Sequence, residues 1–150
     1  MAGGAAETAN PPDAVIKEIL ERYRTVAVVG LSADPERPSH EVAAFLKAHG
    51  FRIVPVNPNL ENVLGEKCYP DLASIPFKVE IVDVFRRPEF VPRIAAEAVK
   101  AGAKVLWLQI GIVDAEAAER HKKDLTVIMD RCMAIEYGRL VKKPSRQAPV

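Results

Sequence analysis

Cysteine and histidine are scarce in this 150-residue sequence, which contains two cysteines and three histidines. Cys68 and Cys132 lie far apart, and the histidines are scattered along the chain. This pattern excludes a zinc cluster and a disulfide framework. A reducing compartment explains it most simply, so we expect a cytoplasmic protein.

An excess of charge of one sign is also missing, because 21 basic and 20 acidic side chains leave a formal net charge of +1. The charge gives no reason to expect nucleic acid or a membrane as partner. No apolar run is long enough to span a bilayer, and residues 1–10 lack the basic start and apolar centre of a secretory signal. We therefore expect a soluble protein with a small-molecule ligand, and leave open a homo-oligomer or a partner protein.

Short apolar runs alternate with amphipathic segments, which predicts strands alternating with helices. The expected strands are 25–29, 52–56, 79–85, 104–108 and 126–129. The expected helices are 12–23, 39–49, 89–101 and 114–123, with short turns of helix at 71–75 and after 132. Continuous apolar runs are typical of strands buried on both faces. The order predicts an α/β protein with a Rossmann-like, doubly wound, parallel five-stranded sheet and helices on both faces.

The chain length suits one domain with a sizeable core. We expect a disordered leader at 1–11, a single domain at 12–140 and a flexible tail at 141–150, because both ends are small and polar. Asn10 or Asp13 could cap the first helix, and Ser39 could cap the second.

Ligands of doubly wound sheets bind outside the carboxyl ends of the strands. After the first strand, Gly30 permits a tight turn, and the next helix directs free N–H groups at the same loop. The loop also supplies hydroxyl donors and a guanidinium, from Ser32, Ser39 and Arg37. These features predict a diphosphate site, and the alternative is an ordinary strand-to-helix loop.

The dinucleotide fingerprint G-x-G-x-x-G is incomplete, because Ser32 and Pro35 occupy its second and third glycine positions. The acidic residue that would hold the ribose of NAD is also missing, since the second strand ends in Asn57 and Pro58. A phosphorylated ribose would meet no carboxylate repulsion there. The sequence therefore disfavours NAD and is compatible with a ribose phosphate.

Further candidates follow the third and fourth strands. Val84 and Phe85 could line an adenine, with Arg86 or Arg87 stacking on the ring or binding phosphate; the alternative is a core aromatic beside arginines in a solvated loop. Gln109 can donate and accept at a ligand, and Gly111 permits a close approach.

Five short motifs therefore fall in order at the predicted strand ends. They are Gly30-x-Ser32-x-x-Pro35-x-Arg37-x-Ser39, Val56-Asn57-Pro58, Val82-Asp83-Val84-Phe85-Arg86, Leu106-Trp107-Leu108-Gln109-x-Gly111 and Met129-Asp130-Arg131-Cys132. Together they resemble the small stand-alone CoA-binding domain proteins, which are similar to the N-terminal CoA-binding domain of the succinyl-CoA synthetase α subunit. The resemblance covers residues 16–140.

The resemblance implies a Rossmann-like fold that holds coenzyme A (CoA) across these loops. The implied contacts are Gly30, Ser32, Arg37 and Ser39 for the diphosphate, Asn57 and Pro58 for the ribose 3′-phosphate, Val84, Phe85, Arg86 and Pro88 for the adenine side, and Gln109 and Gly111 toward the pantetheine. The ligase relatives place a basic residue shortly after the second strand, where this chain has Asn-Leu-Glu-Asn at 59–62. Contact with the 3′-phosphate would then fall to Arg37 or Arg86.

The sequence favours a module that binds CoA or acyl-CoA without chemistry of its own, as a carrier, sensor or partner subunit, because no nucleophile–base pair has a readable spacing. The alternatives are an NAD(P)-linked or thiol-dependent acyl-CoA enzyme using Cys132, and an interaction protein that has lost the ligand. We expect Gly30→Val to abolish binding while the domain stays folded, because the side chain would fill the diphosphate approach.

Overall fold

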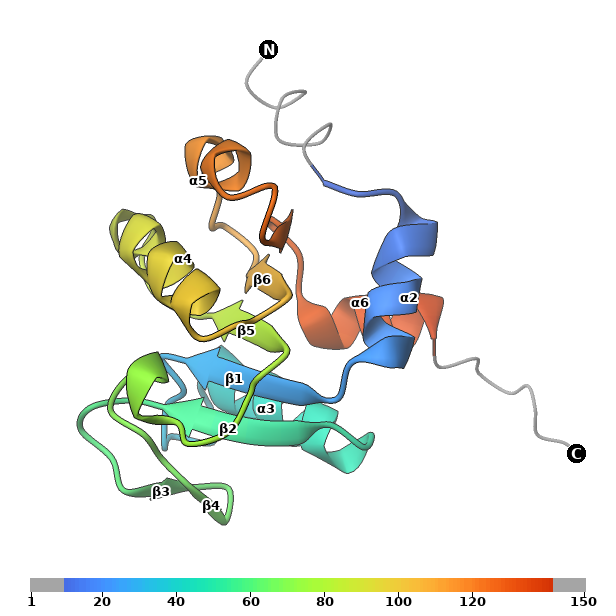
Figure 1. The fold of residues 1–150 in the computed structure, drawn as a ribbon. Coiled ribbons are helices and arrows are strands. Elements are labelled where there is room, and N and C mark those ends of the chain that lie inside the picture. The colour runs from blue at the N-terminus through green and yellow to red at the C-terminus, as the bar shows by residue number, and fades with distance from the viewer. Residues whose placement is uncertain (1–9, 142–150) are drawn as a thin grey trace, which may run out of the picture.

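A five-stranded, fully parallel sheet forms the centre of the molecule (Figure 1), in a computed structural model that describes residues 10–141. Its strands are β1 (Thr25–Val29), β2 (Arg52–Val56), β5 (Ile81–Val84), β6 (Val105–Leu108) and β7 (Thr126–Ile128). They are arranged in the order β2-β1-β5-β6-β7, and every neighbouring pair is parallel. This confirms the predicted Rossmann-like α/β sheet.

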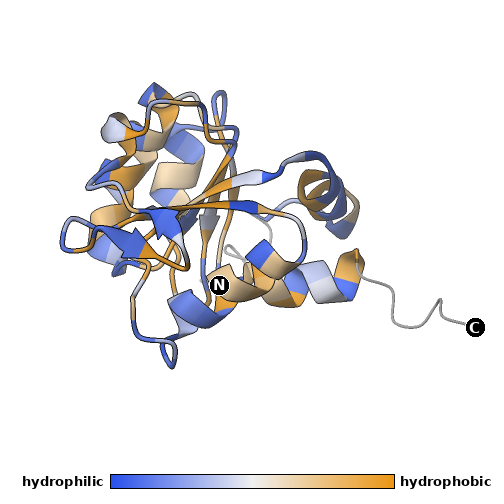
Figure 2. Ribbon diagram, turned by 90° about the horizontal axis from the view of Figure 1, so that it is seen from below, coloured by the Kyte–Doolittle hydropathy of each residue, from blue (hydrophilic) through white to orange (hydrophobic). Residues whose placement is uncertain are grey.

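Helices cover both faces of the sheet, because successive side chains of each strand point to opposite faces and nearly all of them are apolar. One face packs against α2 (Asp13–Arg22), α3 (Pro38–Ala48) and α6 (Met133–Leu140). The other packs against α4 (Val91–Lys100) and α5 (Ala115–Arg120). Figure 2 shows hydrophilic and hydrophobic residues alternating along these helices, as expected of amphipathic helices with one buried face. Within residues 10–141, no helix is long and apolar enough to cross a membrane.

The helix starts differ from the expected caps. α2 begins after Pro12 without a side-chain cap. The side chain of Asn10 is engaged elsewhere, because it accepts from the backbone N–H of Met129 at 2.7 Å and donates to the C=O of Met129 at 2.9 Å. Asp13 accepts hydrogen bonds from Arg139. α3 begins at Pro38 rather than Ser39, with Arg37 at the cap position. The remainder of the expected leader and all but the first residue of the expected tail lie outside the described residues.

A small hairpin was not predicted within the segment 59–77, which the sequence indicated to be irregular. It consists of β3 (Asn62–Val63) and β4 (Glu66–Lys67), joined at Leu64 and Gly65, which both have positive φ. Tyr69 then forms a parallel bridge to Val56 at the edge of β2. The expected helical turn is present as η1 (Leu72–Ser74), whereas α6 is a full helix rather than a single turn.

The connections reverse direction between β1 and β5. From β1 the chain crosses through α3 to β2 on one side, and it then returns past β1 to add β5, β6 and β7 on the other side. The carboxyl ends of β1 and β2 lie on the left of Figure 1. Since ligands of such folds bind at this reversal, the carboxyl ends of β1, β2 and β5 are where a site is expected.

Candidate functional site

A cavity of about 550 Å³ opens at the carboxyl ends of β1 and β2, between η1 and the start of α4. Its size is within the usual range for small-molecule sites. The residues that line it come from five segments: Val29, Gly30, Val56, Asn57, Pro58, Asn59, Pro70, Asp71, Leu72, Arg86, Phe90, Arg93, Ile94 and Glu97. Four of the predicted site residues are therefore brought together here, namely Gly30, Asn57, Pro58 and Arg86.

Gly30 ends β1 with a φ of 90°, a conformation that favours glycine. A Cβ atom at this position would lie 2.7 Å from the carbonyl oxygen of Phe85 and 3.0 Å from Cδ of Arg86. The glycine is therefore required by the packing of the β1 and β5 ends on each other. This corrects the expectation that Gly30→Val would leave the domain folded, because that side chain would collide with backbone.

Asn57 fixes the turn after β2 to the loop after β1. Its side-chain amide donates to the carbonyl of Leu31 at 3.0 Å, and its side-chain oxygen accepts from the N–H of Asn59 at 2.9 Å. Its backbone N–H donates to Tyr69 at 2.9 Å. Pro58 is exposed on the cavity wall. The structure thus assigns Asn57 a clear architectural role at the place where the sequence predicted a ribose.

The loop between β1 and α3 carries the other predicted diphosphate contacts, beside the cavity rather than in its wall. The hydroxyl of Ser39 is buried and accepts from the N–H of Ser32 at 3.0 Å, while the hydroxyl of Ser32 accepts from the N–H of Asp34 at 3.0 Å. Arg37 is exposed, and α3 has no side-chain cap. Both serines therefore shape the loop, and the exposed side chain of Arg37 is left accessible beside it.

Three of the predicted adenine contacts lie elsewhere. Val84 is fully buried in the core under α4 and exposes no surface to the cavity. Phe85 is half-buried on the opposite face of the sheet, among residues that pack against α3 and α6. Pro88 is exposed at the start of η2 (Pro88–Phe90). Among the adenine contacts that the resemblance implied, Arg86 is the one that lines this cavity.

At the end of β6, Gln109 is 6% exposed and donates its side-chain amide to Asp83 at 2.7 Å. Asp83 is fully buried in β5, and its second carboxylate oxygen has no partner among the described residues. Burial raises the pKa of Asp83 to about 7, and the hydrogen bond from Gln109 opposes this shift only in part. Gly111 has a φ of 88°, and its N–H donates to the carboxylate of Asp130 at 2.7 Å.

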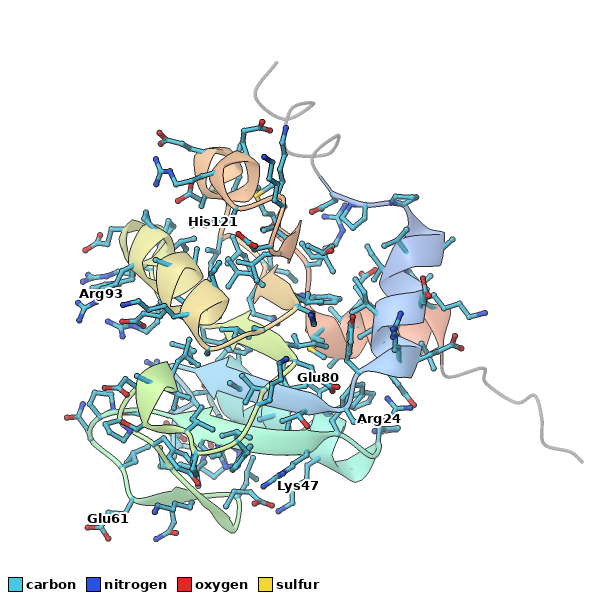
Figure 3. All side chains as sticks on the ribbon, viewed as in Figure 1. Arg24, Lys47, Glu61, Glu80, Arg93 and His121 are labelled. Atoms are coloured by element: carbon cyan, nitrogen blue, oxygen red, sulfur yellow. The ribbon has the colours of Figure 1, made fainter. Side chains whose placement is uncertain are left out.

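Sequence reasoning missed the contribution of η2 and α4 to the cavity. Phe90, Arg93, Ile94 and Glu97 line it at helical spacing, and this periodicity was the available signal. The guanidinium of Arg86 lies over the ring of Phe90, 4.1 Å from its centroid. Arg93 forms an ion pair with Glu97 at 3.5 Å, with the Arg93 side chain 81% exposed (Figure 3). The cavity wall therefore combines an aromatic ring with two guanidinium groups.

Asp71 is the second acidic residue of the cavity wall. Its carboxylate accepts from the hydroxyl and the backbone N–H of Ser74, at 2.6 and 2.9 Å, and so caps η1. These hydrogen bonds hold the pKa of Asp71 below its usual value. Asp71 thus has a structural role at the rim opposite α4.

The chain is similar to several known proteins. A family model described as a CoA binding domain matches residues 24–138. The uncharacterized protein YneT of Bacillus subtilis is 44% identical over 130 residues, which cover 86% of this chain and 96% of YneT. The α subunit of the ADP-forming acetate–CoA ligase II of Pyrococcus furiosus is 31% identical over 125 residues.

The solved structure of a hypothetical protein from Pyrococcus horikoshii OT3 superimposes with a TM-score of 0.85 at 41% identity, covering 89% of this chain and 94% of that one. The ligase match covers 81% of this chain but only 26% of the ligase subunit, so the similarity concerns one region of that enzyme. The family match, in contrast, extends from β1 to α6. The chain therefore belongs to the CoA binding domain family.

Proposed function

We propose that this protein binds CoA, free or acylated, across the carboxyl ends of β1, β2, β5 and β6. The observation that carries the proposal is the cavity beside Gly30, Asn57 and Arg86 in a member of this family. It lies where the connections of the sheet reverse, as expected for a nucleotide site.

Each part of CoA has chemically suitable neighbours along this edge. The diphosphate would lie against the loop 30–39, where α3 begins without a side-chain cap and Arg37 is exposed. The adenosine would occupy the cavity, where Phe90 and Arg86 offer an aromatic and a cationic surface. The pantetheine would extend toward Gly111 at the end of β6. Asn57 stands where NAD-binding proteins use a carboxylate, which favours CoA over NAD.

We further propose that the protein holds its ligand without changing it, as a carrier, sensor or partner module. The placement of the thiols supports this role. Cys68 is buried and its thiol contacts the carbonyl of Asn57, and burial raises the pKa of Cys68, which disfavours the reactive thiolate. Cys132 packs against the apolar core at the start of α6.

Titration calorimetry of nucleotide-stripped protein with CoA, NAD and NADP tests the proposal. We expect saturable binding of CoA and no binding of NAD, because the turn after β2 lacks the carboxylate that holds the NAD ribose. Binding of NAD with CoA silent would overturn the proposal and favour an oxidoreductase.

A further inference from the structure

The turn that follows β2 contains no cation. Pro58 and Asn59 line the cavity there, and neither side chain can neutralise a phosphate. Because the end of the second strand is the place of the nucleotide ribose in folds of this kind, a phosphate on that ribose needs a cation from another element. The cations in the cavity wall are Arg86, after β5, and Arg93, on α4.

Arg86 is available for an anion. Among residues 10–141 it has no carboxylate within ion-pair distance, whereas its neighbour Arg87 pairs with Glu89 at 3.5 Å. The ring of Phe90 supports its guanidinium at 4.1 Å, and its Cδ atom lies beside Gly30. Arg86 is therefore positioned between the loop after β1 and the cavity, with its hydrogen-bond donors uncommitted to a carboxylate.

Arg93 is engaged, but weakly. Its partner Glu97 lies one turn further along α4 and also lines the cavity. Because both side chains are accessible to solvent, this ion pair is weak and Arg93 can leave Glu97 for another anion. A phosphate entering the cavity would compete with Glu97 for Arg93, and the carboxylate of Glu97 would repel it.

We propose that Arg86, joined by Arg93 on its release from Glu97, binds the ribose 3′-phosphate of CoA and makes this protein select CoA over dephospho-CoA. This inference rests on the proposed function. It assigns the discrimination between CoA and dephospho-CoA to the segment after β5 and to α4. Glu97 has the opposite effect, because its carboxylate competes with the phosphate for Arg93 in the same cavity.

The test is the ratio of the dissociation constants for dephospho-CoA and CoA, measured by titration calorimetry. We expect the wild-type protein to bind CoA about tenfold to a hundredfold more tightly, the range of one or two charge-assisted hydrogen bonds. Arg86→Gln should bring the ratio close to one by weakening CoA, and Glu97→Gln should increase it by about threefold to tenfold.

Arg87→Gln is the matched control, since Arg87 is the next residue, is exposed and does not line the cavity. It should leave the ratio unchanged. If Arg86→Gln unfolds, Glu97→Gln still tests the inference. This variant should fold, because the side chain of Glu97 is accessible to solvent. Equal wild-type affinities for the two ligands, or a ratio insensitive to both variants, would overturn this inference while CoA binding stands. Failure to bind either ligand would overturn the proposed function itself.

Discussion

At the scale of single residues, the most unusual group is the carboxyl of Asp83. It lies in the central strand β5, between Val28 of β1 and Trp107 of β6, and it is fully buried. Its one partner among the described residues is the amide of Gln109. With a pKa of about 7, this carboxyl holds its proton well into the range where an exposed aspartic acid is ionised. Burial in the sheet therefore favours the neutral form of Asp83, and ionisation of this carboxyl destabilises the folded protein.

This predicts a specific pH dependence. The pKa of Asp83 is about 7 in the folded protein and about 3.9 in the unfolded chain, so the folded state holds the extra proton between these values. The free energy of unfolding should therefore fall as the pH rises through this range, by about 1.4 kcal/mol per pH unit from this group, and level off above about pH 7. Asp83→Asn, which cannot ionise, should be the more stable protein at pH 8 by roughly 2–4 kcal/mol.

Urea denaturation of both proteins at several pH values between 5 and 8 checks this prediction. Other titrating groups contribute equally to the two proteins, so the difference between them isolates Asp83. Parallel stability profiles would show that the carboxyl does not titrate in this range.

The residue scale also shows what the sequence can and cannot reveal about the site. Gly30, Asn57, Pro58 and Arg86 could be expected at this edge of the sheet because each lies within two residues of a strand end, and strand ends are fixed by where apolar runs stop. The roles of Ser32 and Ser39 as donors to a ligand remain a prediction, since both hydroxyls accept hydrogen bonds within the loop. The hydrogen-bond partners of these hydroxyls depend on the backbone path of the loop, and that path cannot be predicted from the residue types alone.

At the scale of elements, the site depends on how the strand ends are tied together. Asn57 joins the turn after β2 to Leu31 in the loop after β1, and Tyr69 covers the edge of β2. The strand bounds β1 and β2 were predictable because continuous apolar runs end at glycine or Asn-Pro. The hairpin β3–β4 was not predictable, because strands of two residues show no periodicity. The face that α4 presents to the cavity was not predictable either, because it depends on how the helix packs against the sheet.

Removal of the Asn57 side chain should weaken this connection between the two loops. Asn57→Ala loses two hydrogen bonds, to Leu31 and from Asn59, so we expect a loss of about 1–2 kcal/mol in the free energy of unfolding and weaker binding of CoA. Denaturant unfolding and calorimetry measure the two effects. Asn59→Ala is the control for stability, because the side chain of Asn59 is exposed and its hydrogen bond to Asn57 uses the backbone N–H. Equal losses of stability in the two variants would contradict the role given to Asn57.

At the scale of the whole molecule, one sheet organises the protein, and the reversal of its connections places the accessible loops at one edge. Rossmann-like folds serve many functions, so the fold locates a site without naming its ligand. Here the ligand class comes from the family, and the structure adds a cavity with an aromatic and a cationic wall. A second cavity, of about 470 Å³, lies between η1 and the C-terminal end of α4 and provides an internal comparison.

The central claim is that CoA binds along the carboxyl edge of the sheet. At 16.5 kDa the protein suits amide NMR spectroscopy, and chemical-shift changes on saturation with CoA map the contact directly. The account predicts that the largest changes lie at 30–39, 57–59, 85–93 and 109–111. Changes centred instead on the second cavity, around Phe77 and Lys100, would contradict it.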